Sequence, residues 1–276
     1  MPTINTNVAA IKARSNLERV QRDMDQSIAR LSSGKRITRA HDDAAGQAIA
    51  GRMESQVRGL QMSIRNTKDG QSLVDTQEGA LQEVTAILQR MRELAVQASS
   101  GVAVSADKNY LNLEMTQLYN EIDAIGVNTK FNDKNVLTGA TFKFYTDIDV
   151  NGTAVSVLAL SMTGAAIGLS STSVSIGSLT GQISIVSVIS RFDTAIQSVA
   201  AMRANLGAIS NRFDHVIDNL SNVVANTEAS KSRVEDADFA VETTQLTRNT
   251  VLQQAATSMV AQANAQKNTI LALIQG

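Results

Sequence analysis

Side chains that commonly carry catalysis or bind metals are sparse in this sequence, and their spacing favours neither role. The two histidines, His41 and His215, lie far apart, and neither belongs to an HExxH zinc motif. The pair Asp42–Asp43 has the right type for acid–base chemistry, but a carboxylate between a turn and a helix is better explained as a helix cap. Cysteine and glycine-rich phosphate-binding motifs are absent. We therefore predict no catalytic site, no metal and no cofactor.

Binding is the chemistry that one helical stretch suggests. The run LQRMRELAVQASSG spans residues 88–101, and its apolar side chains recur every three or four positions, as on one face of a helix. These side chains are Leu88, Met91, Ala95 and Ala98. Polar residues, among them Gln89, Arg90 and Gln97, lie between them. Helical spacing alone shows a free face and does not distinguish a solvated surface from a contact surface.

Composition narrows the class of protein. The net charge of the 276 residues is -1, so the overall balance gives no electrostatic case for nucleic acid. Aromatic residues make up 3% and the single proline is Pro2, which favours long, thinly packed helices over a compact aromatic core. The N-terminus lacks the pattern of a secretory signal, and no run of 18 apolar residues predicts a membrane span.

Apolar residues at helical spacing predict five helical segments. Gly34 is the expected end of the first, and a carboxylate of Asp42 or Asp43 is the expected cap of the second. Sustained seams of this kind are typical of coiled coils, so the predicted fold class is mainly α. The segments cover residues 8–31, 44–99, 111–125, 192–223 and 252–273.

The middle of the chain, residues 138–190, is rich in Ser and Thr and nearly free of charge. Asn151–Gly152 stands between two β-prone runs, which is a strong hairpin signal. We expect a β-hairpin and loops here. If the segment holds nothing else, a short Gly/Ser linker in place of residues 160–180 should leave assembly intact.

The two ends of the chain have too little large apolar surface to fold alone. For residues 1–33 and 240–276, the entropy lost on ordering the backbone exceeds what burial against one partner helix returns. Such ends should be poorly ordered in a monomer and should fold when several neighbours surround them. This predicts an elongated helical protein that assembles.

Several stretches at both ends, taken in order, resemble bacterial flagellin, the subunit of the flagellar filament. The resemblance covers about residues 1–140 and 190–276. The stretches are INTNVAAI (4–11), RLSSGKRITRAHDDAAGQAIAGRM (30–53), EGALQEVTAILQRMRELAVQ (78–97), FNDKNVLTG (131–139), LGAISNRFDHVIDNLSN (206–222), SRVEDADFAVET (232–243) and MVAQANAQ (259–266).

The resemblance implies an elongated antiparallel helical coiled-coil hairpin with a small β-hairpin region, and little or no outer domain. Residues 1–40 and 235–276 would be terminal helices that line an inner tube and are disordered in the monomer. Residues 41–137 and 190–234 would form a long-helix rod, and residues 138–189 the hairpin and a short variable insert.

The same resemblance implies a structural, non-enzymatic protein that polymerises into the filament used for swimming. It would be exported through the flagellar type III apparatus without a cleaved signal and would reside outside the cell. Expected partners are further copies of itself, the flagellar cap and hook–filament junction proteins, a chaperone on the C-terminal helix, and the flagellin-sensing Toll-like receptor. Neither nucleic acid nor membrane is an expected partner.

Two sets of residues carry these expectations. Receptor and subunit contacts are expected on one face, with Arg90 and Leu94 as anchors pointing away from the apolar seam. That face comprises Gln89, Arg90, Leu94, Gln97 and Glu114. The inner-tube assembly seam comprises Val8, Ile11, Leu252, Met259, Ile270 and Leu273.

Three alternatives fit the sequence less well. The hook–filament junction protein shares the terminal motifs, usually less completely. A chemoreceptor-like signalling coiled coil has long proline-free heptads but requires a membrane span or sensor domain. A flagellin with a metallopeptidase insert requires HExxH in the middle of the chain, where none occurs.

Overall fold

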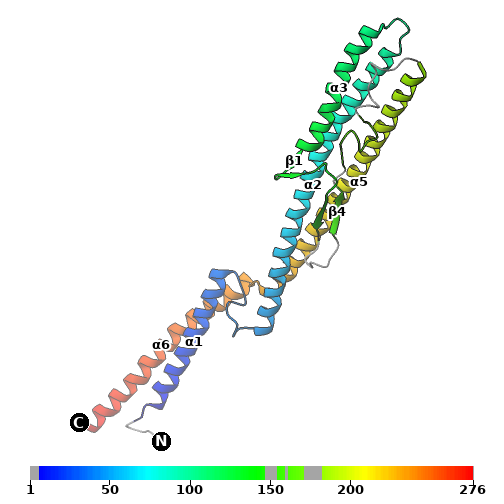
Figure 1. The fold of residues 1–276 in the computed structure, drawn as a ribbon. Coiled ribbons are helices and arrows are strands. Elements are labelled where there is room, and N and C mark those ends of the chain that lie inside the picture. The colour runs from blue at the N-terminus through cyan, green and yellow to red at the C-terminus, as the bar shows by residue number, and fades with distance from the viewer. Residues whose placement is uncertain (1–5, 147–153, 159–160, 171–181, 276) are drawn as a thin grey trace. The chain divides into compact units, whose positions relative to one another are not determined.

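The fold is mainly helical, as predicted (Figure 1). The computed structural model describes residues 6–146, 154–158, 161–170 and 182–275, without the side chains of 182–184 and 266–275. Two of the helices run for 55 and 54 residues, in keeping with a sequence whose one proline is at position 2. The helices are α1 (Val8–Ser33), α2 (Ala44–Ala98), α3 (Ser105–Asn128), α5 (Gln182–Glu235) and α6 (Phe239–Gln275).

Two compact units divide the chain. Unit 1 comprises residues 1–57 and 225–276, and unit 2 comprises residues 58–224. These boundaries fall within α2 and α5, whereas the three predicted domains were divided at the helix ends and at the middle segment. The assignment of separate roles to three domains stays a prediction.

Helix α1 has a defined beginning and end. The Asn7 side chain accepts a hydrogen bond from the backbone N–H of Ala10 at 3.1 Å, so it caps the first turn. At the other end Gly34 has a φ of 70°, and its N–H donates to the carbonyl of Arg30 at 2.8 Å. This left-handed conformation suits glycine, which confirms Gly34 as the predicted helix stop.

Unit 2 has a closed apolar core between α2, α3 and α5. Helical periodicity predicted most of its members, because each helix turns one apolar stripe towards the others. The edge-to-face rings of Phe144 and Phe213, 6.0 Å apart, join the β-hairpin to this core. Its fully buried members include Leu81, Val84, Leu88, Met91, Ala95, Ala98, Met115, Ile122, Phe192, Val199, Leu206 and Phe213.

Two short antiparallel strand pairs follow α3. β1 (Lys130–Phe131) and β2 (Lys134–Asn135) are joined by Asn132 and Asp133, which have positive φ. β3 (Thr141–Tyr145) pairs with β4 (Ala154–Leu158), confirming the predicted hairpin. The turn expected at Asn151–Gly152 lies outside the described residues.

Among the described residues, one helix segment, Ile185–Glu235 of α5, is long and apolar enough to cross a membrane by length and composition alone. This is weak support for a membrane span, because Phe192, Val199 and Phe213 of this helix are buried in the core of unit 2.

The segment after β4 belongs to the core of unit 2. Met162, Ile167 and Leu169 are at most 5% exposed. The Met162 N–H donates to the carbonyl of Leu137 at 3.0 Å, and a Cβ on Gly126 would clash with the Met162 carbonyl oxygen. The premise that residues 160–180 hold only replaceable loop was therefore wrong for residues 161–169, because sequence patterning did not reveal their burial.

Replacing Met162 by alanine is expected to lower the free energy of unfolding by about 2–5 kcal/mol, since a fully buried side chain leaves a cavity. Chemical denaturation followed by circular dichroism measures this. Val102→Ala, at a residue 88% exposed, is the control and should change stability by less than about 0.5 kcal/mol. Equal midpoints for Met162→Ala and the wild type would contradict the assignment of this segment to the core.

Candidate interaction surfaces

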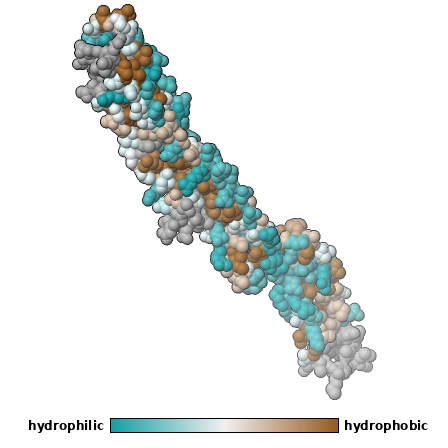
Figure 2. Space-filling model, turned by 90° about the vertical axis from the view of Figure 1, so that its right-hand side faces the viewer, coloured by the Kyte–Doolittle hydropathy of each residue, from teal (hydrophilic) through white to brown (hydrophobic). Residues whose placement is uncertain are grey.

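The helix pair α1·α6 leaves its apolar seam open. Of the predicted seam residues, Val8 is 50%, Ile11 59%, Leu252 41% and Met259 63% exposed. The side chains of Ile270 and Leu273 lie outside the described residues, so their part in the seam stays a prediction. Figure 2 shows apolar residues, in brown, on the surface of this helix pair. One helix thus covers only part of the apolar surface that the other presents.

Polar contacts fix how α1 and α6 pair. The Arg30 guanidinium lies 2.9 Å from the Glu242 carboxylate, whose side chain is 7% exposed. Near the start of α1, the Asn7 side-chain amide donates to the Ala263 carbonyl at 3.0 Å. These contacts orient the two helices while leaving the seam free for other partners.

Backbone hydrogen bonds join the linker after α1 to the junction between α5 and α6. The Arg36 N–H donates to the Glu235 carbonyl at 2.6 Å, and the Ala237 N–H donates to the Gly34 carbonyl at 2.9 Å. The Lys35 ammonium also lies 2.5 Å from the Glu235 carboxylate. Two segments about 200 residues apart in sequence are therefore held as a short antiparallel bridge.

The two adjacent aspartates after this linker have different roles. Asp43 accepts a hydrogen bond from the Gly46 N–H at 2.8 Å and caps α2, as predicted for one of the pair. Asp42 instead folds the loop: one carboxylate oxygen accepts from the Thr38 hydroxyl at 2.9 Å and from the N–H groups of Thr38 and Arg39 at 3.1 and 3.0 Å. Sequence spacing did not predict this second role.

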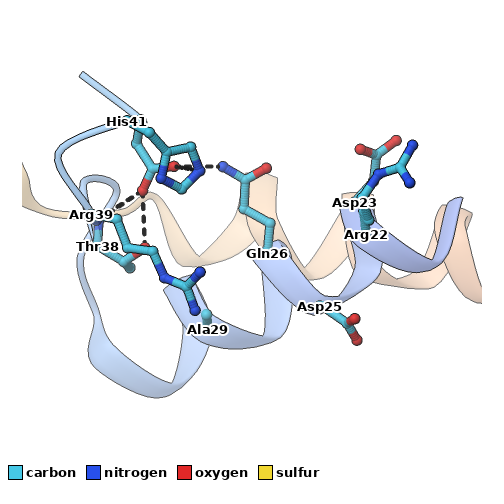
Figure 3. A pocket seen from close by; sticks show the side chains of 9 residues that line it. Arg22, Asp23, Asp25, Gln26, Ala29, Thr38, Arg39 and His41 are labelled. Carbon is cyan, nitrogen blue, oxygen red and sulfur yellow. Dashed lines mark hydrogen bonds and ion pairs between the residues drawn. The ribbon is translucent and has the colours of Figure 1, made fainter. Parts of the chain in front are cut away.

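The other oxygen of Asp42 binds two side chains (Figure 3). The Gln26 amide and the His41 imidazole each lie 3.1 Å from it, and the Asp42 side chain is only 1% exposed. The hydrogen bond from Thr38 is the largest influence that lowers the pKa of Asp42 below its usual value, with further contributions from the Arg39 and Thr38 amides. The Asp42 carboxylate therefore stabilises the conformation of this loop.

A polar hollow of about 490 Å³ opens beside Asp42, lined by Arg22, Asp23, Asp25 and Arg39 among others (Figure 3). Across the described residues, no group of three or more His, Cys, Asp or Glu side chains gathers as a metal site requires. The hollow therefore offers charged groups for contact and no recognisable ligand set for a metal.

The predicted face on α2 and α3 is centred on Arg90. Its guanidinium lies 3.0 Å from the Glu114 carboxylate of α3 and 3.2 Å from that of Glu93. The hydrogen bond that Arg90 donates to the Glu114 carboxylate is the largest cause of the raised pKa of Arg90. Gln89 and Gln97 are exposed nearby on α2, so the structure brings four of the five predicted residues to the surface.

Leu94 is the exception. It is 1% exposed and belongs to the core of unit 2, so the expectation that it points outward with Arg90 was wrong. Leu94 follows Met91 by three residues and precedes Ala98 by four, so a stripe wider than a strict heptad seam includes it. The sequence interpretation placed Leu94 away from the seam of Leu88, Met91 and Ala95, whereas α2 contacts the core on a broader face. Glu93, which sequence reasoning did not single out, pairs with Arg90 in its place.

Comparison with known proteins matches both ends of the chain. Residues 4–141 match the bacterial flagellin N-terminal helical region, and residues 189–274 match the bacterial flagellin C-terminal helical region. The flagellins of Halalkalibacterium halodurans and Bacillus subtilis are each 39% identical to this chain, and each alignment covers 99% of both proteins. The flagellar filament core protein flaB2 of Brachyspira hyodysenteriae is 37% identical at the same coverage.

Among solved structures, the chain is similar to the crystal structure of Bacillus cereus flagellin, with 31% identity and a TM-score of 0.46 over 56% of this chain and 88% of that one. Long helices with an exposed apolar seam define a mainly helical protein with a surface suited to protein contacts. The family matches go further: this chain belongs to the bacterial flagellin family.

Acid is expected to weaken the loop that Asp42 holds. Because the folded-state pKa of Asp42 is lowered, its stabilisation is present above the unfolded pKa, about 3.9, and is lost as pH falls through the lower folded value. The stability difference between the wild type and Asp42→Ala should therefore shrink from pH 5 to pH 2, measured by denaturant unfolding. A constant difference for Asp42→Ala would contradict this role.

Proposed function

We propose that this chain polymerises into a flagellar filament through its α1·α6 pair, and that the filament works outside the cell in swimming. The observation that carries the proposal is the exposed seam, in which Val8, Ile11 and Met259 are each at least 50% exposed. The relatives support the proposal through their names, which are flagellin and flagellar filament core protein. The family is one of structural proteins.

The physical reason for polymerisation is the uncovered apolar surface. Burial of such surface contributes roughly 25 cal/mol per Å², and neither helix of the pair offers its partner enough cover. Several identical neighbours can cover this apolar surface when the contacts between copies repeat head to tail. Contacts of this kind generate helical filaments. We infer that the terminal helices gain most of their order on assembly.

Further partners follow from family membership as proposals. The cap and the hook–filament junction protein would bind the same seam at the two ends of a filament. An export chaperone would cover the C-terminal helix before assembly, because Leu252 and Met259 would otherwise be exposed in the cell. Export would proceed without a cleaved signal.

Substituting Ile11 and Met259 together by serine is expected to raise the critical concentration for polymerisation about tenfold or more, because apolar burial between copies is lost. Sedimentation of filaments over a concentration series measures it. Gln21→Ser with Gln254→Ser, at exposed positions of the same helices, is the matched control and should assemble normally. Deletion of residues 1–33 or 240–276 should abolish filaments. Wild-type levels of assembly in the seam variant would refute the proposal.

We also propose that the released monomer is recognised by the flagellin-sensing Toll-like receptor through the Arg90 face. Arg90 and Glu114 are 51% and 44% exposed at their side chains, and Gln89 and Gln97 flank them on α2. An exposed arginine held in a fixed position by two carboxylates presents its remaining donors in one geometry, as interface hot spots commonly do. Leu94, being buried, would act only by supporting the helix beneath this face.

Arg90→Ala is expected to reduce receptor activation by about tenfold or more in a reporter cell line while leaving helicity unchanged. Arg92→Ala is the control: Arg92 pairs with Asp193 of α5 at 2.7 Å, outside the proposed face. Leu94→Ala should lower the unfolding midpoint as well as the signal. An inactive wild-type monomer, or full activity of Arg90→Ala, would overturn the receptor assignment without affecting the assembly proposal.

A further inference from the structure

Positive charge is concentrated in one part of the α1·α6 pair. Residues 8–22 of α1 and 243–265 of α6 together contain five basic side chains and one acidic side chain. We call these two stretches the basic segment. Its acidic residue, Glu18, is paired with Arg14 at 3.1 Å. The remaining basic residues are exposed, and they are Lys12, Arg19, Arg22 and Arg248.

Arg19 and Arg248 meet at one hollow. They line an open groove of about 330 Å³ between α1 and α6, together with Asp23 and with Arg30, whose charge is matched by Glu242. The groove thus offers two guanidinium groups from different helices with one nearby carboxylate. Planar guanidinium groups suit carboxylate ligands, which they bind with paired hydrogen bonds.

Negative charge is concentrated in one part of unit 2. Residues 69–89 of α2 and 213–224 of α5 contain six acidic side chains and no lysine or arginine. We call these two stretches the acidic segment. The Gln71 amide donates to Asp214 at 2.9 Å, which shows that the two stretches lie against each other. Arg203 neutralises Glu78 at 2.7 Å. Exposed carboxylates remain at Asp69, Asp75, Glu83 and Asp218.

We propose that the basic segment of one copy docks on the acidic segment of a second copy. The inference rests on the proposed function, because it names an electrostatic contact within the polymer that the apolar seam does not explain. Each copy carries both a basic and an acidic surface, so any two neighbouring copies can bring opposite charges together. Apolar contacts alone permit helices to slide along one another, whereas matched charges fix the register and speed association.

Another reading of the basic segment is a membrane surface, since exposed Val251 and Leu252 lie beside Arg248. The acidic segment favours a second copy, because a lipid-binding helix pair needs no complementary surface on its own chain. Vesicles containing phosphatidylglycerol distinguish the two. Docking between copies predicts no cosedimentation of monomer with such vesicles at 150 mM NaCl.

The first test reverses charge in each segment. Arg19→Glu with Arg248→Glu is expected to raise the critical concentration for polymerisation about tenfold, because attraction at two sites becomes repulsion. Asp75→Lys with Glu83→Lys should have a similar effect. Lys130→Glu with Lys134→Glu, at exposed positions of β1 and β2, carries the same change of charge as the first variant and is the matched control. It should assemble at the wild-type concentration.

The second test mixes the two reversed chains. Each alone presents two surfaces of like charge, but an equimolar mixture restores opposite charges at every contact of an alternating polymer. The critical concentration of the mixture should return to within about threefold of the wild type, since the charge pairs are regained. Circular dichroism of each variant shows whether it retains the wild-type helix content.

The outcomes separate the two levels of the proposal. Wild-type protein that never polymerises overturns the proposed function. Polymerisation of the wild type together with unchanged assembly of both folded, charge-reversed variants overturns the electrostatic contact alone. Recovery only when all four substitutions lie in one chain places the contact within a copy, which also overturns it. Vesicle binding lost on Arg19→Glu with Arg248→Glu would assign the basic segment to a membrane instead.

Discussion

The stability of this protein depends on covering the narrow apolar stripes of its long helices. A stripe of Leu, Val, Ile and Ala can be buried only by another helix or strand, because too few aromatic side chains are present to form a thick core. In unit 2, α3, α5 and the β-hairpin all contribute to covering α2, and the residues from Leu81 to Ala98 on its inner face are fully buried. Ion pairs such as Arg92–Asp193 and Arg203–Glu78 border that core. They set register at the surface, while apolar burial provides most of the stability.

The same requirement is left unmet in unit 1. There α1 and α6 pair mainly with each other, apart from the loop that Asp42 joins to Gln26, and Ser27 is the one residue of α1 that is buried. Specific polar contacts, Arg30 with Glu242 and Asn7 with Ala263, set the pairing. A helix pair oriented by hydrogen bonds but incompletely covered presents an apolar surface that further neighbours can bury. That combination accounts for how one chain can have both a self-sufficient unit and a unit suited to assembly.

Much of this organisation was predictable from sequence. Helical period identified all five helices that the structure describes, and glycine and aspartate chemistry identified the end of α1 and the cap of α2. The failures share a cause. Leu94 and Met162 are buried by elements that the one-dimensional pattern does not place, namely a wide contact face on α2 and a chain segment folded back on Gly126. The hydrogen bonds of Asp42 to Thr38 and Gln26 likewise depend on how a loop returns to its helix, which spacing does not encode.

Unit 1 is discontinuous in sequence: the Asn7 side chain bonds the Ala263 carbonyl across 256 positions, with the whole of unit 2 between them. Closing a loop of that length has an entropic cost that is offset only when the contacts of the helix pair have formed. Contacts of this sequence separation therefore form late in folding. During synthesis α1 therefore has no partner until nearly the entire chain has been made. Unit 2 can fold as soon as α5 is available, and the chain ends pair last. A cut between α5 and α6 would then remove the pairing of both termini at once while leaving the central core intact.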